Sequence, residues 1–215
     1  MLTKIELLKG YKVYKIAMII VLFMVGCNSS NKSKTSTIAV ASMSSIVDDF
    51  SSKDPAWSIK KGDWSFSNDI LKQSATDESF PVILLEKSKI ANFDLSVDFR
   101  PISGSADASG GVIFRAIDKD NYYIVRANAL EGNFRLYTFK NGNRTEIATA
   151  DVVAPKMGEF HTIRVVAKAN HIQAYLDKKL YIDHKDDSFS NGYVGLWTKA
   201  DSVTEFDNLT IKIEK

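Results

Sequence analysis

The amino-acid sequence predicts an all-β protein, a sandwich or jelly roll of antiparallel strands. From about residue 46 onward the chain consists of short segments in which apolar and polar residues alternate, as in ANFDLSVDFRP at 91–101. Turn residues separate these segments at spacings of roughly 8 to 12 residues, which is typical of sandwiches and barrels. No long stretch shows the helical period of about 3.6 residues. The length of this region suits a single domain, 46–215.

The N-terminal segment has the composition of an export signal. Four lysines precede an uninterrupted apolar run at 16–25, which is shorter than the roughly 20 residues that a membrane-spanning helix needs. The run ends at Gly26-Cys27, and Cys27 is the only cysteine in the chain. The ending MVGC resembles a bacterial lipobox, whose cysteine is acylated and becomes the first mature residue. We therefore expect 1–26 to be a lipoprotein signal peptide and Cys27 to carry a lipid; the alternative is a plain secretory signal with an incidental cysteine.

The next segment, 27–45, is predicted to be a flexible tether. It is rich in Ser, Thr, Asn and Lys, a composition that buries too little apolar surface to offset the entropy of ordering the chain. By resemblance to Gram-negative lipoproteins, Asn28 in place of an aspartate favours the outer membrane. The expected location is the cell envelope, with membrane contact through the lipid.

The charge balance gives no basis for nucleic-acid binding. The whole chain has 28 basic and 26 acidic residues, but four lysines and one glutamate lie in the first 26 positions, which leaves 24 basic and 25 acidic residues. A nucleic-acid-binding domain needs a clustered basic face. A single cysteine also leaves no partner for an intramolecular disulfide.

The predicted strands of the domain follow one another without helices between them. They lie in ANFDLSVDFRP, GGVIFRAIDKDNYYIVRAN, NFRLYTFKNGNRTEIATA, EFHTIRVVAKANHIQAYLDKKLYIDH, GYVGLWTKA and EFDNLTIKIE. In the second of these, a turn at 118–121 would place Arg115 opposite Ile124. One face of this hairpin is then almost wholly apolar, with Val112, Phe114, Ala116, Tyr123, Val125 and Ala127. The other face carries Ile113, Arg115, Ile117, Tyr122, Ile124 and Arg126. Burial of the apolar set selects this register.

The second face of the hairpin has residue types that suit a polyhydroxylated ligand. The guanidinium groups of Arg115 and Arg126 are planar donors for pairs of hydroxyls, and the rings of Tyr122 and Trp197 can stack on a sugar. The alternative is that both arginines pair with carboxylates on neighbouring strands and that Tyr122 only packs. Trp57 and Trp64 lie among apolar neighbours and are predicted to belong to the core.

The order of several short motifs resembles the concanavalin A-like lectin/glucanase superfamily. These motifs are DDF, W…GDW, FDLSVDFR, GGVIFRAIDKDNYYIVR, FHTIRVVAKANHIQAYLDKKL, GYVGLWT and FDNLTI, and they extend from about residue 47 to 213. Within the superfamily the chain is most similar to laminin-G-like and 3-keto-disaccharide hydrolase-type domains. The resemblance implies a jelly-roll β-sandwich of two curved antiparallel sheets with sugars on the concave sheet.

No catalytic apparatus is recognisable in the sequence. The E-x-D-x-x-E strand motif of the family 16 glucanases, which supplies their catalytic carboxylates, does not occur. Asp94 and Asp98 share a strand face but flank no third acid, and we expect them to be outer-face residues. There is no G-x-S-x-G nucleophile motif, and His161, His171 and His184 lie near no recognisable partner.

A structural calcium ion is a further expectation. Asp48 and Asp49 come at the first predicted strand and Asp207 in the last, and the terminal strands of such folds are neighbours. Because Asp207 has the parity of Leu209 and Ile211, it is predicted to point inward and to need a partner. Ca²⁺ held by Asp49 and Asp207 is one solution, and hydrogen bonds to amides or an arginine are the other.

The sequence thus predicts a lipid-anchored, extracytoplasmic domain that binds a glycan and carries no catalytic residues. Two alternatives stay open. One is a glycoside hydrolase of the 3-keto-disaccharide hydrolase type, and the other is a structural or protein-interaction module of the envelope.

Overall fold

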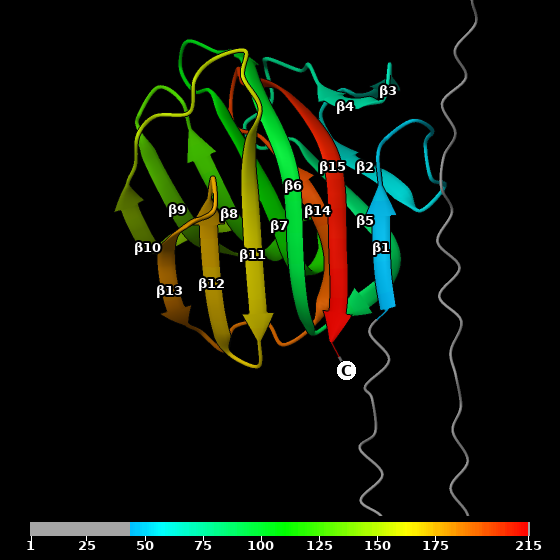
Figure 1. Cartoon of the computed structure of the whole chain (residues 1–215), viewed down its shortest axis with the longest axis vertical. Helices are drawn as coiled ribbons and strands as arrows, with labels where there is room; N and C mark the ends of the chain where they lie inside the picture. The colour runs from blue at the N-terminus through cyan, green and yellow to red at the C-terminus, as the bar shows by residue number, and fades with distance from the viewer. Residues whose placement is uncertain (1–43, 215) are drawn as a thin grey trace, which may run out of the picture. The chain divides into compact units, whose positions relative to one another are not determined.

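The protein is described here by a computed structural model, which covers residues 44–214. This part of the chain folds into fifteen antiparallel strands and no helix, arranged as two packed sheets (Figure 1). The strands are β1 (Ser44–Asp48), β2 (Trp57–Lys61), β3 (Trp64–Ser67), β4 (Ile70–Gln73), β5 (Val82–Ile90), β6 (Asn92–Ser103), β7 (Ser109–Asp118), β8 (Asn121–Asn128), β9 (Asn133–Lys140), β10 (Asn143–Asp151), β11 (His161–Lys168), β12 (His171–Leu176), β13 (Lys179–Lys185), β14 (Gly192–Trp197) and β15 (Val203–Glu214). The predicted all-β sandwich is confirmed.

The two sheets have eight and seven strands. Sheet A has the order β13-β12-β11-β6-β15-β4-β3, with β1 also paired to β15, and sheet B has the order β10-β9-β8-β7-β14-β5-β2. The first strand pairs with the last from Ser44 opposite Ile213 to Asp48 opposite Leu209, so the terminal strands are neighbours as predicted. The first strand begins two residues before the predicted domain start at 46. The predicted signal peptide, Cys27 and most of the predicted tether lie outside the described residues.

The main core lies between the sheets and follows from strand alternation. In sheet A, Phe93, Leu95, Val97 and Phe99 alternate along β6 and are fully buried. Trp57 and Trp64 also belong to this core, as the sequence predicts.

Sheet B is apolar on both faces. Val112, Phe114 and Val125 face the main core, whereas the intervening Ile113 and Ile124 belong to a second buried cluster on the outer face of the sheet. This second cluster consists of Val82, Leu84, Ile113, Ala116, Tyr122, Ile124, Tyr137, Phe139 and Trp197, with Phe80 and Tyr193 packed against it. An antiparallel sheet usually turns a polar face to solvent, so this outer face is unusual.

A β-bulge in β7 changes the predicted hairpin. Ile113, not Arg115, lies opposite Ile124, and the ladder is interrupted between Phe114 and Asp118. Arg115 adopts a left-handed conformation with φ of 50° and leaves the strand alternation there. The prediction that Arg115 shares a face with Arg126 is therefore wrong.

A second bulge, in β15, changes the predicted orientation of Asp207. Phe206 is buried before the bulge and Leu209 after it, and the extra residue, Asn208, has φ of 53°. Asp207 thus follows the parity of Glu205 and lies on the outer face of sheet A. The prediction that Asp207 points inward is wrong because the inserted residue reverses the alternation.

Candidate functional site

Arg126 is the centre of a polar group on the outer face of sheet B. Across the sheet, Arg126 on β8 lies opposite Arg135 on β9 and Gly111 on β7, and Gly111 in turn lies opposite Trp197 on β14. Gly111 lies between the arginine and the tryptophan in a tight place, where a Cβ would come within 3.0 Å of Arg126 Cβ. Arg126 itself is only 1% exposed, so its charge depends on the partners that surround it.

Glu131 is the carboxylate that balances the two arginines. Arg126 donates to the Glu131 carboxylate at 3.1 Å and to Asn133 Oδ1 at 2.8 Å, and Asn133 donates to Glu131 at 2.7 Å. The Arg135 guanidinium lies 3.9 Å from the same carboxylate. The hydrogen bond from Asn133, followed by that from Arg126, lowers the pKa of Glu131 and keeps it ionised.

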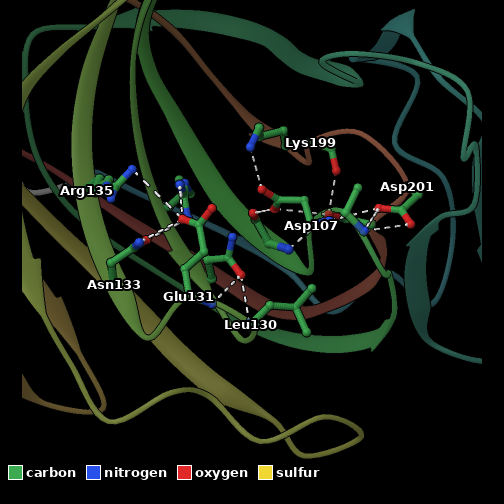
Figure 2. Close-up of polar contacts among 12 residues, drawn as sticks. Asp107, Leu130, Glu131, Asn133, Arg135, Lys199 and Asp201 are labelled. Atoms are coloured by element: carbon green, nitrogen blue, oxygen red, sulfur yellow. Dashed lines mark hydrogen bonds and ion pairs between the residues drawn. The ribbon is translucent and has the colours of Figure 1, made fainter.

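The turn between β8 and β9 places Glu131 at the end of the sheet. Asn128 Oδ1 accepts hydrogen bonds from the backbone N–H groups of Leu130 and Glu131 at 2.8 and 3.2 Å. Gly132 follows with φ of 60°, a conformation that glycine adopts at little cost. The turn therefore holds the Glu131 side chain over the arginines, where it is 39% exposed (Figure 2).

A second polar group lies at the same end of sheet B, where β7 begins and β14 ends. Asp107 is fully buried and accepts hydrogen bonds from Lys199 Nζ at 2.7 Å and from the Ser109 hydroxyl. Asp201 accepts hydrogen bonds from three successive N–H groups, those of residues 105–107, which lower its pKa. The charge of Lys199 also helps to lower the pKa of Glu131, so the two groups adjoin (Figure 2).

Several buried donors on the outer face of sheet B lack a hydrogen-bond partner. Arg126 Nε and Arg144 Nη1 have none. Trp197 Nε1 is close enough to Tyr122 to influence it but forms no hydrogen bond of standard geometry. Arg135 Nε lies 3.3 Å from the Glu146 carboxylate but likewise forms no hydrogen bond of standard geometry. Unpartnered buried polar atoms are rare in folded proteins and suggest a missing water or ligand.

The two arginines predicted to bind a ligand lie in different parts of the structure. Arg126 lies in the polar group described above. Arg115 is 1% exposed at the other end of the sandwich, where it donates four hydrogen bonds to the carbonyl oxygens of Ala91, Ala169 and Phe189. It is a structural residue in this fold. The β7 bulge, invisible in the sequence pattern, placed it there.

The predicted aromatic platform is covered. Trp197 is fully buried, and the Phe80 ring stacks on it with a centroid distance of 5.7 Å. Tyr122 is 1% exposed and stacks on Phe139 at 4.5 Å. A ligand can reach the Trp197 ring only if Phe80 moves.

Other predicted positions carry out structural contacts on sheet A. Asp94 receives two hydrogen bonds from Arg164 at 2.7 Å, and Asp98 accepts from the Thr162 hydroxyl at 2.6 Å. The His161 ring is held by Asp177 at 2.8 Å and by the backbone N–H of Lys156 at 2.9 Å. Both ring nitrogens of His161 are engaged, as expected for a structural histidine.

Calcium at Asp49 and Asp207 stays a prediction. Burial raises the pKa of Asp207, as do the neighbouring Asp98, Asp49 and Asp69. Within residues 44–214, no group of three or more His, Cys, Asp or Glu side chains is arranged to hold a metal ion. Over the same range, no helix is long and apolar enough to cross a membrane.

Sequence reasoning missed most of the site. Glu131, Lys199 and Asp107 lie in loops, where alternation carries no information, and Arg135 and Arg144 lie on strands whose faces were not assigned. The turn sequence Leu-Glu-Gly between two strands was the one available signal for Glu131.

Chemically, the arrangement offers fixed donors and acceptors of hydrogen bonds at the end of a sheet. Guanidinium N–H groups donate, and the ionised Glu131 carboxylate only accepts. Such a set can hold hydroxyl groups or an anionic group. The pKa values of Glu131 and Asp201 are both lowered, so these two carboxylates are held in the ionised, accepting form.

Known proteins similar to this chain are associated with carbohydrates. The family described as "3-keto-alpha-glucoside-1,2-lyase-like domain" matches residues 45–212. Levanase of Bacillus subtilis (strain 168) is 27% identical over 165 residues, which cover 75% of this chain. The match covers 23% of the levanase, so the chain spans about a quarter of that relative.

Solved structures with the same architecture include a binding module and an enzyme. The carbohydrate binding module CBM66 from Bacillus subtilis has a TM-score of 0.68 and 23% identity, with 73% of this chain and 95% of the module covered. The beta-glucanase of Bacillus licheniformis has a TM-score of 0.60 and 12% identity, with coverage of 80% and 98%. At these identities the likeness shows the fold, which is the jelly roll of the concanavalin A-like lectins and glucanases.

Proposed function

The chain belongs to the family of 3-keto-alpha-glucoside-1,2-lyase-like domains, and we propose that it is a carbohydrate-binding domain with its ligand site on the outer face of sheet B. The observation that carries this proposal is the group formed by Arg126, Glu131 and Arg135. Its donors and acceptors are fixed by each other and by the sheet, and Glu131 and Arg135 remain 39% and 32% exposed. The likeness to a carbohydrate binding module and to levanase supports the same ligand class.

The protonation state of the site favours binding over glycosidic hydrolysis. A glycosidase of the two-carboxylate type needs one carboxylic acid that stays protonated near neutral pH, with its pKa raised by its surroundings. Hydrogen bonds from Asn133 and Arg126 have the opposite effect on Glu131 and lower its pKa. Asp107, a second carboxylate nearby, is fully buried beneath Lys199. Neither residue fits the role of the acid.

Export and lipid anchoring are part of the proposal and rest on Cys27 and its flanks. The position of the first strand is compatible with this role. Ser44 pairs with Ile213, near the C-terminal end of β15. The other end of β15 begins at Val203, directly after Ser202. The Ser202 hydroxyl accepts a hydrogen bond from the backbone N–H of Ser109, close to Asp107. A 12-residue strand is roughly 35–40 Å long. Ser44 and the polar group at Arg126 therefore lie at opposite ends of the sandwich.

The test is a glycan-array screen of residues 44–215, followed by calorimetry on the glycans that bind. Glu131→Gln and Arg135→Met each remove one charge from the exposed part of the site. Arg100→Met is the matched control, because Arg100 is 31% exposed and pairs with Glu205 on the other sheet. We expect about a tenfold or greater loss of affinity for the two site variants, the value of one charge-assisted hydrogen bond, and no loss for the control.

The proposal fails if no glycan binds, or if all three folded variants bind alike. Circular dichroism and urea unfolding of each variant separate a loss of binding from a loss of fold.

A second candidate function is the lyase activity that the family description prints. Elimination from a 3-keto-glucoside removes the proton at C2 and breaks the bond from C1 to the leaving oxygen, so it needs a base beside C2. Glu131 is ionised, which suits a base. The lyase function is distinguished from binding alone by incubating the protein with a 3-keto-α-glucoside and measuring the released aglycone. If the protein is a lyase, it releases the aglycone and Glu131→Gln abolishes the release. A purely structural module of the envelope would show neither binding nor release.

A further inference from the structure

Arg144 is fixed on the outer face of sheet B by two aromatic rings. It is the second residue of β10 and lies opposite Phe139 on β9. Its guanidinium carbon lies 4.7 Å from the centroid of the Tyr137 ring and 5.1 Å from that of Phe80. Because stacking uses the faces of a guanidinium, its N–H edge stays available for a planar, bidentate partner. Arg144 as a whole is half-buried, and its Nη1 is shielded from solvent.

Arg144 differs from its neighbouring arginines in lacking a carboxylate. Arg126 is paired with Glu131, and Arg135 with Glu131 and Glu146. Within the described residues, no carboxylate oxygen lies within 4.0 Å of Arg144, and its buried Nη1 has no hydrogen-bond partner. An unpaired charge and an unpartnered donor are both costly when they are partly removed from water.

The unpartnered buried side-chain atoms of the described chain are all donors. They are Arg126 Nε, Asn128 Nδ2, Arg135 Nε, Arg144 Nη1 and Trp197 Nε1. All except Asn128 Nδ2 belong to the outer face of sheet B. A hydroxyl both donates and accepts, whereas a carboxylate only accepts. Around Arg144, which has no carboxylate of its own, a carboxylate complements the unpartnered donor better than another neutral hydroxyl does.

A cavity beside Arg144 has room for one sugar ring. It measures about 130 Å³ and is walled by the rings of Phe80, Tyr122 and Phe139, with Lys119 and Asp120 among the polar groups around it. A buried cavity of about 150 Å³ holds a benzene molecule, so the space matches a single six-membered ring. Arg144 does not itself line this cavity, but its guanidinium lies against the Phe80 ring, which forms one of the walls.

Arg126 and Arg144 share one aromatic neighbour. The Arg126 guanidinium carbon is 5.9 Å from the same Tyr137 ring on which Arg144 stacks. A ligand that contacts both groups would have to pass over this ring.

From these contacts we propose that the glycan bound on the outer face of sheet B carries a carboxylate, as in a uronic acid, and that Arg144 receives it. This inference rests on the proposed function and specifies its ligand class. The sugar ring next to the carboxylate occupies the cavity walled by Phe80, Tyr122 and Phe139, and its hydroxyls meet the polar groups around that cavity.

The test compares each acidic oligosaccharide with its own carboxyl-reduced form. Oligogalacturonide, oligomannuronate and a glucuronate-containing oligosaccharide are titrated in both forms by calorimetry, at about 0.05 and 0.5 M NaCl. A sulfated neutral oligosaccharide is included as a second anion. The proteins are residues 44–215 of the parent, Arg144→Met, and Arg100→Met as a control, since Arg100 also stacks on a ring, that of Phe160 at 4.3 Å.

We expect at least one acidic form to bind about tenfold or more tightly than its reduced counterpart, the value of a charge-assisted hydrogen bond. Arg144→Met should bring the affinity for the acidic form down to that for its reduced counterpart, whereas Arg100→Met should leave the preference intact. Raising the NaCl concentration should weaken binding of the acidic form and leave binding of the reduced form unchanged.

Equal binding of acidic and reduced forms, or a preference that survives Arg144→Met, overturns the inference while the carbohydrate-binding function stands. Preference for the sulfated oligosaccharide over every carboxylate overturns it as well. If no oligosaccharide binds in either form, the inference is overturned, and the glycan array alone decides whether the proposed function stands.

Discussion

Replacing Arg115 by methionine should destabilise the fold without affecting the ligand site. Arg115 donates to three backbone carbonyls, at distances from 2.6 to 3.1 Å, and so joins the turns before β6 and β12 to the loop before β14. Three unpartnered carbonyls would cost about 1–3 kcal/mol each. Relief of the desolvated charge offsets part of this cost. The expected net loss is about 3–5 kcal/mol in the free energy of unfolding.

The assay is urea unfolding, with the midpoint and the slope compared between variants. Arg164→Met is the control, because Arg164 makes two 2.7 Å hydrogen bonds to Asp94 but its side chain is 43% exposed. An exposed pair contributes about 1 kcal/mol or less. If Arg115→Met costs no more than Arg164→Met at an unchanged slope, the structural role assigned to Arg115 is refuted. If Arg115→Met stays folded yet loses glycan binding, the sequence prediction of a ligand-binding Arg115 is restored.

Three further predictions concern packing, pH and the anchor. Gly195→Ala should cost about 1–3 kcal/mol in urea unfolding, because a Cβ there would lie 2.2 Å from the Ile83 carbonyl oxygen; an unchanged midpoint would contradict this. The pKa of Glu131 is lowered in the folded state mainly by the hydrogen bond from Asn133, and that of Asp94 mainly by the hydrogen bond from Arg164. The ionised carboxylates therefore stabilise the fold fully at pH values above their ordinary pKa values of 4.5 and 3.8. Stability should therefore decline as pH falls below about 4, and Glu131→Gln should reduce the decline. Cys27→Ser in the full chain should abolish fatty-acid labelling and move the protein from the membrane to the soluble fraction; labelling that persists would refute the lipid at Cys27.

Alternation was enough to predict the fold and most of the core. A strand with one buried face must place apolar residues at every second position, so the pattern of the sequence assigns Val112, Phe114, Tyr123 and Val125 to the core. They do lie there. The predicted pairing was two residues out, but an even shift preserves the face of each side chain.

The errors arose where one inserted residue reversed the alternation. Arg115 and Asn208 have φ values of 50° and 53°, and both lie at interruptions of the ladder. Neither arginine nor asparagine predicts a left-handed backbone conformation from the sequence pattern alone. Asparagine adopts this conformation more readily than most residues do. The predicted alternation therefore places Asp207 on the wrong face of its sheet. It also places Arg115 on a face that the bulge in β7 makes it leave.

The outer face of sheet B has more apolar and cationic groups than the sandwich requires for its stability. The core between the sheets already buries the inner face, and a polar outer face would satisfy an antiparallel sheet. This chain instead places Trp197, Phe139 and Tyr137 there and stacks Arg126 and Arg144 on the Tyr137 ring. Stacked arginines whose donors are not all used are expensive to maintain without a partner. A ligand that supplies acceptors to these donors would offset that cost, as bound water would in its absence.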